Sequence, residues 1–260
     1  MKLNETKLGR WTVFYGDPAE FRDLKTEIWT RGGYYFDPEE EDSEGNWGDG
    51  EGRVIVDAGA HMGLASLYWL GIWPRARVWA VEPNEENLRI LRENVAVNGL
   101  GGQVEAIGAA LVGDQAGRRR FYYDRVGEWL MSGSLSEGAW DGSETSQEVW
   151  VETRLLSEIL EAARTESPRQ KIDLLKMDIE GAEGEVLREA REELRWVQRL
   201  ILEYHPTGAK SQDWGGLIKL LEKAGFTLTF YDQKNDLLSP AQAAQTATAK
   251  KLVMIWGSRA

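Results

Sequence analysis

Two acidic residues stand at the points where two short apolar segments end. Asp57 closes the segment VIVD, and Glu82 closes the segment VWAVE further along the chain. Gly59 and Gly63 follow the first acid. If both segments are parallel strands, their carboxyl ends share one edge of a sheet, and the two carboxylates lie side by side. Glycines let the backbone approach a ligand at that edge, and a carboxylate on the second strand can accept both hydroxyls of a ribose. The spacing therefore predicts a nucleoside site.

The turn after the first strand distinguishes between nucleoside cofactors. A dinucleotide fingerprint requires G-x-G-x-x-G, but GAHMG at 59–63 has one glycine too few. Asp57 would also repel a pyrophosphate, whereas it tolerates a cationic amino-acid nucleoside. These features favour S-adenosylmethionine, whose sulfonium and ammonium groups are positive. The alternative, an ordinary strand cap and a surface acid, explains each acid alone but not the pair at consecutive strand ends.

A second polar cluster follows two later apolar segments, KIDLLKMD (171–178) and RLILEYH (199–205). Its members are the candidate catalytic residues Lys176, Asp178, Glu180, Glu203 and His205. If the cofactor is S-adenosylmethionine, the expected reaction is methyl transfer. This reaction requires that the acceptor is aligned with the methyl group and that the acceptor's proton is removed. His205 is the preferred general base because an ordinary histidine pKa is about 6.5.

Structural roles for the same residues stay open. His205 could instead satisfy a loop carbonyl, and Lys176 could only neutralise its acidic neighbours. Glu180 and Glu183 fit the first turn of a helix, where the dipole favours acids.

The cluster also allows a mechanism that uses a metal. Asp178, Glu203 and His205 are donors that a divalent cation could share, and the cation would lower the pKa of an acceptor hydroxyl. We favour catalysis without a metal, and we expect no other metal site.

Predicted strands and helices alternate along the chain, and they must position these residues. The sequence predicts strands at 11–15, 53–57, 77–82, 104–113, 171–178, 199–205, 226–232 and 251–257. Amphipathic helices are expected after Asp17-Pro18, at 64–70, from Asn84, after 178 and at 211–224. Continuous apolar strands between such helices predict an α/β fold with a doubly wound, mostly parallel sheet. The last two strands have only a polar, Ala-rich connection, which favours an antiparallel pair at a sheet edge.

The chain divides into three regions. Residues 1–36 form a strand–helix extension. Residues 37–52 hold eight acids, four glycines and no basic residue, which indicates a mobile acidic loop. Residues 53–260 form the main domain, in which 118–160 is expected to be an inserted hairpin or lid.

Composition excludes several function classes. The chain of 260 residues has a net charge of −12, which disfavours a nucleic-acid partner. The absence of cysteine excludes disulfides, thiolate metal sites and cysteine nucleophiles. We find no signal peptide and no apolar run of the ~20 residues that a membrane helix needs. A cytoplasmic protein without membrane contact is therefore expected.

Four segments together resemble one enzyme family. They are VIVDAGAHMGLASLYWL, VWAVEPNEENLRILRENVAVNGL, DLLKMDIEGAEGEVL and LILEYHP. They resemble the FkbM-type family of S-adenosylmethionine-dependent methyltransferases from about Tyr34 to Tyr231, and the combination of KMDIEGAE with EYHP is the most specific part. The resemblance implies the Rossmann-like class I methyltransferase fold, with seven strands and an antiparallel last strand. It also implies an acceptor hydroxyl on a small molecule or sugar.

The resemblance assigns roles to individual residues. It places Asp57, Gly59 and Gly63 along the methionine part of the cofactor and Glu82 at the ribose. It places Asn84 beside the adenosine and Ala109 at the adenine. Independently of the resemblance, we expect Asp178 to contact both the cofactor and the acceptor. His61 is a departure, because the family usually has Asn there; its backbone role should persist, whereas a side-chain hydrogen bond is in doubt.

Two other functions stay open from the sequence. One is a nicotinamide-dependent oxidoreductase, which the missing glycine disfavours. The other is a catalytically silent cofactor-binding protein, which the intact polar cluster disfavours. The sequence leaves the acceptor and the number of subunits undetermined.

Overall fold

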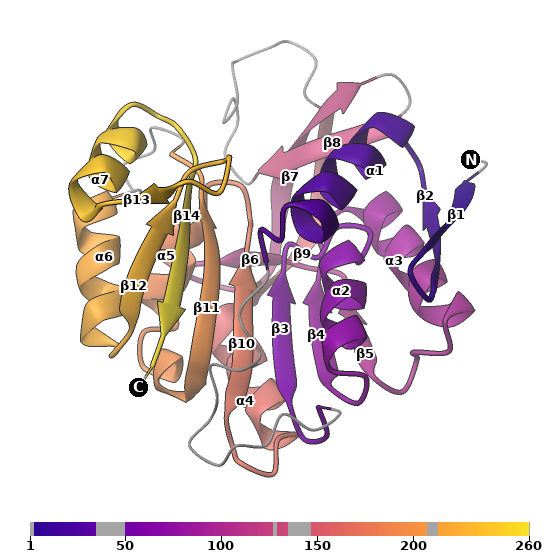
Figure 1. Cartoon of the computed structure of the whole chain (residues 1–260), viewed down its shortest axis with the longest axis horizontal. Coiled ribbons are helices and arrows are strands. Elements are labelled where there is room, and N and C mark those ends of the chain that lie inside the picture. The colour runs from indigo at the N-terminus through magenta and orange to yellow at the C-terminus, as the bar shows by residue number, and fades with distance from the viewer. Residues whose placement is uncertain (1–2, 35–49, 127–128, 135–146, 207–212, 260) are drawn as a thin grey trace.

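A mixed sheet of eight strands forms the centre of the protein (Figure 1). The computed structural model describes residues 3–34, 50–126, 129–134, 147–206 and 213–259. In spatial order the strands are β13 (Leu237–Leu238), β12 (Thr227–Tyr231), β14 (Val253–Ser258), β11 (Val197–Tyr204), β10 (Ile172–Met177), β3 (Val54–Ala58), β4 (Arg77–Val81) and β5 (Val104–Ile107). The predicted doubly wound α/β fold is confirmed. The sheet has eight strands where seven were expected, because the two-residue β13 pairs with β12.

The strands that carry the predicted site are parallel neighbours. β3 pairs in parallel with both β4 and β10, and β10 pairs in parallel with β11. Their carboxyl ends therefore meet at one edge of the sheet.

The last strand is antiparallel, as expected, but it does not lie at the edge. β14 pairs with both β11 and β12. Val253 and Ile255 of β14 are fully buried, as a central strand requires. The connection before β14 also contains a helix that the sequence reading missed, α7 (Pro240–Thr248). A capping box from Ser239 and Gln242 starts this helix, and only small Ala side chains face the core, so it lacks an apolar stripe.

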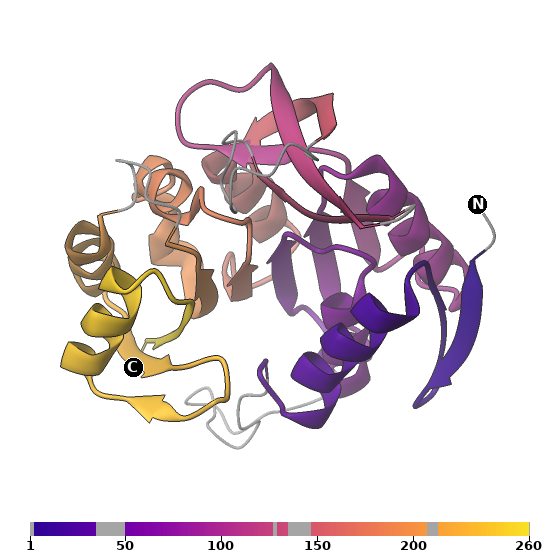
Figure 2. The ribbon, with the colours of Figure 1, turned by 90° about the horizontal axis from the view of Figure 1, so that it is seen from above.

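The apolar segment 104–113, predicted as one strand, forms two. β5 ends at Ile107 and β6 (Ala110–Val112) joins a different sheet, with the order β6-β9-β7-β8. The chain turns away at Gly108, where an added Cβ would approach Leu88 Cδ2 to 2.8 Å. The smaller sheet continues with β7 (Arg118–Val126), β8 (Trp129–Ser134) and β9 (Gln147–Leu155), which Figure 2 shows above the large sheet. Segment 118–160 thus contains these three strands and the first residues of α4 (Leu156–Thr165).

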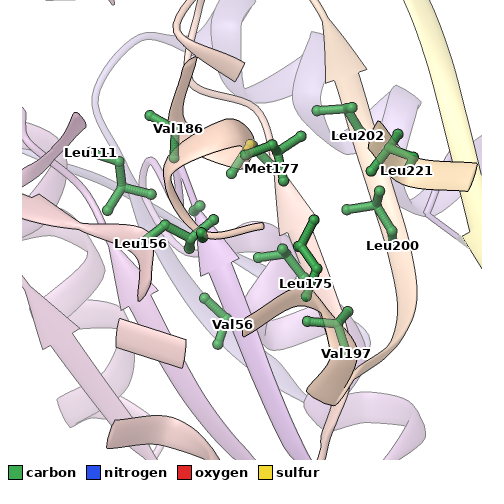
Figure 3. Packing of buried hydrophobic residues seen from close by; sticks show 14 of the residues in the cluster. Val56, Leu111, Leu156, Leu175, Met177, Val186, Val197, Leu200, Leu202 and Leu221 are labelled. Atoms are coloured by element: carbon green, nitrogen blue, oxygen red, sulfur yellow. The ribbon is translucent and has the colours of Figure 1, made fainter. Parts of the chain in front are cut away.

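Helices cover both faces of the large sheet and bury two apolar clusters. α4, α5 (Glu183–Glu189), α6 (Trp214–Lys223) and α7 pack on one face. Figure 3 shows Val56, Leu175 and Leu200 of adjacent strands pointing into the layer that Leu156 and Leu221 close. α2 (Leu64–Ile72), α3 (Glu85–Val97) and the N-terminal segment bury the other face. In the described part of the chain, no helix is both long and apolar enough to cross a bilayer.

The N-terminal segment reaches the edge where the site was predicted. β1 (Asn4–Leu8), which the sequence reading missed, pairs with β2 (Trp11–Tyr15). α1 (Pro18–Lys25) begins at Asp17, whose carboxylate accepts hydrogen bonds from the N–H groups of Ala19 and Glu20. It continues as a π-helical turn, η1 (Thr26–Thr30). Figure 1 shows α1 above the tips of β3 and β4.

Candidate active site

The turn after β3 has a backbone that favours glycine. Gly59 and Gly63 have φ values of 77° and 87°, and His61 between them has a φ of 51°. All three lie in the left-handed region, which is costly for most side chains. A Cβ on Gly59 would also collide with the carbonyl oxygen of Asp178. Only glycine at this position lets the turn pack against the tip of β10.

Glu82 holds this turn from the tip of β4. Its two carboxylate oxygens accept hydrogen bonds of 2.8 Å from the backbone N–H groups of His61 and Asn84. Burial raises the pKa of Glu82, while His61 and the two N–H groups lower it and so limit the rise. Because each oxygen retains a lone pair, the carboxylate can also accept ligand hydroxyls.

A cavity of about 280 Å³ opens beside this turn. Its lining includes six of the predicted cofactor residues, namely Gly59, His61, Glu82, Asn84, Ala109 and Asp178. Asn84 caps α3 through Oδ1, which accepts from the N–H groups of Glu86 and Asn87. Its Nδ2 is buried and has no hydrogen-bond partner within the described ranges. A polar ligand that accepts a hydrogen bond would satisfy this nitrogen.

Two predicted cofactor residues lie behind the cavity wall. Gly63 is the N-cap of α2 and does not line the cavity. Asp57 is fully buried; Ser66 Oγ donates a hydrogen bond of 2.7 Å to its Oδ2. Lys176 Nζ lies 3.5 Å from the other oxygen, Oδ1. Asp57 therefore acts on the cavity through Lys176 rather than by direct contact.

Lys176 links the turn to the acidic cluster. Nζ donates a hydrogen bond of 2.6 Å to the carbonyl of Gly59 and lies 3.4 Å from Asp178 Oδ2. Burial disfavours its charge, but Asp178, Asp57 and Glu203 overcome this effect and raise the pKa of Lys176. The residue is a permanent cation that fixes Asp178 at the cavity edge.

His205 lies within a ring of carboxylates. Its Nε2 is 3.2 Å from Glu180 Oε2 and 3.3 Å from Glu203 Oε1, and its Nδ1 is 3.3 Å from Glu183 Oε1. Burial would lower the pKa of His205, but these acids raise it well above its usual value of 6.5. An imidazolium is therefore favoured at neutral pH, whereas a general base must be neutral before it accepts a proton. His205 does not line the cavity beside Glu82.

The three proposed metal ligands are also close together. One donor atom each from Asp178, Glu203 and His205 lies within 4.8 Å of the others. The residue types suit a divalent cation with oxygen and nitrogen ligands. A cation would have to replace the proton of His205, because both ring nitrogens already face acids.

Three acids of the N-terminal segment line the cavity and were missed from the sequence, namely Glu20, Asp23 and Glu27. Glu20 Oε1 lies 3.1 Å from His61 Nε2. His61, which stands where the family usually has Asn, therefore has a side-chain partner. Glu27 comes from η1. Glu20 and Glu27 lie at helical spacing with the apolar residues Leu24 and Ile28, which line the same cavity. Acids on an apolar stripe were the signal that could have identified them.

Comparison with known proteins gives the family. The model of the Methyltransferase FkbM domain matches residues 57–228, from the first predicted acid to β12. The chain belongs to the FkbM methyltransferase family. It is therefore a methyltransferase, and the sequence-based assignment to this family is confirmed.

Individual relatives agree with this assignment. Methyltransferase sdnD of Sordaria araneosa is 32% identical over 196 residues, covering 67% of this chain and 74% of the relative. The 2-O-methyltransferase NoeI of Sinorhizobium fredii is 31% identical over 167 residues, covering 58% of this chain but only 63% of the relative. The crystal structure of methyltransferase FkbM from Methylobacillus flagellatus KT superimposes with a TM-score of 0.50 at 16% identity. The superposition covers 93% of this chain and 55% of the chain in that structure, and it supports the assignment of the fold.

Proposed function

We propose that this methyltransferase uses S-adenosylmethionine to methylate a hydroxyl group on a small molecule or sugar. The acceptor class is supported by the relative that is named a 2-O-methyltransferase. The cofactor is supported by family membership, since S-adenosylmethionine use is general in the family.

The observation that carries the proposal is the cavity between the β3 turn and the tip of β4. Glu82 is fixed there by two backbone N–H groups, with lone pairs left for the ribose hydroxyls. Asn84 offers a buried Nδ2 without a partner in the described chain, which suits an acceptor atom of the adenosine. Ala109 contributes an apolar side chain to the cavity wall, which suits the adenine.

The charge distribution of the cavity fits the same cofactor. Asp178 and Glu180 line the side of the cavity nearest β10. The carboxylate of Asp178 stabilises a sulfonium or ammonium there and repels a pyrophosphate, which disfavours a nicotinamide dinucleotide. When bound, S-adenosylmethionine supplies an activated methyl group, so the protein's own tasks are to align the acceptor and remove its proton.

The cluster around His205 organises this chemistry in our proposal. Lys176 fixes Asp178, and the imidazolium of His205 holds Glu180, Glu183 and Glu203. A base role for His205 stays a prediction, which requires that the ring first lose its proton. A positioning role needs no such step.

Calorimetry with S-adenosylhomocysteine tests the cofactor assignment. We expect saturable binding with a dissociation constant in the micromolar range and no binding of NADH under the same conditions. Absence of heat with the adenosyl ligand at high micromolar concentration would refute the proposal. Binding of NADH alone would favour an oxidoreductase.

A further inference from the structure

A second cavity adjoins the one that we assign to the cofactor. It has a volume of about 440 Å³ and lies between the N-terminal helical segment and the chain around β12–β14. Two of the residues that line it, Asp23 and Glu27, also line the first cavity. The two cavities therefore meet at these acids.

Hydrogen-bonding groups of both kinds line the second cavity. Glu203 and Asp232 present carboxylates, whereas Arg31, Gln233 and Asn235 present donors. Asn235 Nδ2 donates a hydrogen bond of 3.1 Å to the carbonyl of Arg31, which ties the β12–β13 connection to the end of η1. A hydroxyl both donates and accepts, so a compound with several hydroxyls matches this lining better than an apolar or an anionic one.

Glu27 differs from Asp23 at the meeting point. The Asp23 side chain is 76% exposed and lies beside Arg22. Glu27 is partly buried, and its carboxylate has no hydrogen-bond or ion-pair partner in the described part of the chain. A partly buried carboxylate at the boundary of two cavities is thus available to a ligand that spans them.

The surroundings of Glu27 suit proton transfer near neutrality. Burial, followed by the nearby charges of Glu203 and Asp178, raises the pKa of Glu27 to about 7, although Lys176 and His205 act in the opposite direction. A base is most effective when its pKa lies near the working pH.

We propose that Glu27 binds the reacting hydroxyl of an acceptor that carries several hydroxyls, held in the second cavity, and removes its proton. The inference rests on the proposed cofactor site in the first cavity. As the acceptor oxygen forms its bond to the methyl carbon, the carbon–sulfur bond breaks and its electron pair stays on sulfur. The hydroxyl proton passes to a carboxylate oxygen of Glu27 and is later released to solvent. A residue of the π-helical turn would thus complete a site that the sheet alone leaves without a free base.

The test compares Glu27→Gln with a matched exposed change, Glu5→Gln in β1. Formation of S-adenosylhomocysteine is measured with glycerol, myo-inositol and D-glucose as acceptors, and S-adenosylhomocysteine binding is measured by calorimetry. We expect methylation of at least one of these compounds by the wild type. Glu27→Gln should lower kcat by about 100-fold and change the affinity for S-adenosylhomocysteine less than threefold. The rise of kcat/KM with pH near 7 should disappear in this variant, and Glu5→Gln should match the wild type.

The possible failures have distinct meanings. If S-adenosylhomocysteine does not bind to the wild type, the proposed function fails before Glu27 is tested. If it binds but none of the three compounds is methylated, the inference about the second cavity is overturned. If Glu27→Gln retains wild-type kcat and its pH dependence, Glu27 is not the base.

Discussion

The backbone N–H of His61 donates a hydrogen bond of 2.8 Å to Glu82 Oε2, so the turn after β3 and the tip of β4 hold each other. In Glu82→Gln, an amide NH2 group would replace one of the two carboxylate oxygens. This NH2 group would face a backbone N–H, so two hydrogen-bond donors would meet and one hydrogen bond would be lost. We expect the dissociation constant of S-adenosylhomocysteine to rise about 10- to 100-fold, or about 1.4–3 kcal/mol. Calorimetry measures this change. The exposed Glu85→Gln three residues later should stay within twofold; equal effects of both changes would contradict the role of Glu82.

Alanine substitutions at three glycines can measure the effect of backbone conformation on stability separately from the effect of close packing. Gly59 has a φ of 77° and no room for a Cβ, Gly99 has a φ of 70° with nothing nearby, and Gly101 has neither constraint. Alanine at these positions should lower the free energy of unfolding by about 3 kcal/mol or more, about 1–2 kcal/mol and less than about 0.5 kcal/mol, respectively. Chemical denaturation measures the series. If Gly59→Ala lowered the free energy of unfolding no more than Gly99→Ala, the close packing of Gly59 against Asp178 would not contribute to stability.

The sequence predicted the parts of the fold that local patterns encode. The acids at the tips of β3 and β4 were identified because a buried strand that ends in a carboxylate is unusual. The chain's departure at Gly108 was missed, since an apolar run looks the same whether it continues one strand or joins two sheets. α7 was missed because Ala side chains produce no apolar periodicity.

The site itself was predicted only where it lies within the sheet. The sequence placed Lys176, Asp178 and His205 near the carboxyl ends of adjacent parallel strands, where the structure also has them. It could not show that four acids surround the histidine. Glu20 and Glu27 reach the cavity through the packing of an N-terminal helix onto strand tips. The local pattern shows that both acids lie on the apolar stripe of that helix, but it does not show which part of the fold the stripe packs against.

The contact between His61 and Glu20 should make the docking of α1 depend on pH. Burial would lower the pKa of His61, but the hydrogen bond and charge of Glu20, aided by Glu82 and Asp178, raise it above 6.5. A raised histidine pKa means that the stabilisation is fully present below pH 6.5 and is lost as the pH rises through the higher folded-state value.

His61→Asn removes this titration. We expect the variant to be less stable than the wild type by about 0.5–1.5 kcal/mol at pH 6. The difference should shrink at pH values above the folded-state pKa of His61. Denaturation curves at several pH values measure both proteins, and subtraction removes the contribution of His205. A stability difference that grows with pH would show that the protonated His61–Glu20 pair is not the source of the stabilisation.

The ring of acids around His205 finally separates the two mechanisms that the sequence left open. Lys176 and the imidazolium already supply two positive charges to Asp178, Glu180, Glu183 and Glu203. A divalent cation on Asp178, Glu203 and His205 would have to expel the ring proton, which these acids hold more tightly than usual. We therefore expect methyl transfer to stay within about twofold of its original rate after treatment with EDTA and buffer exchange. A sample that is exchanged without EDTA is the control, and activity that disappears and returns with Mg²⁺ or Mn²⁺ would establish the metal mechanism instead.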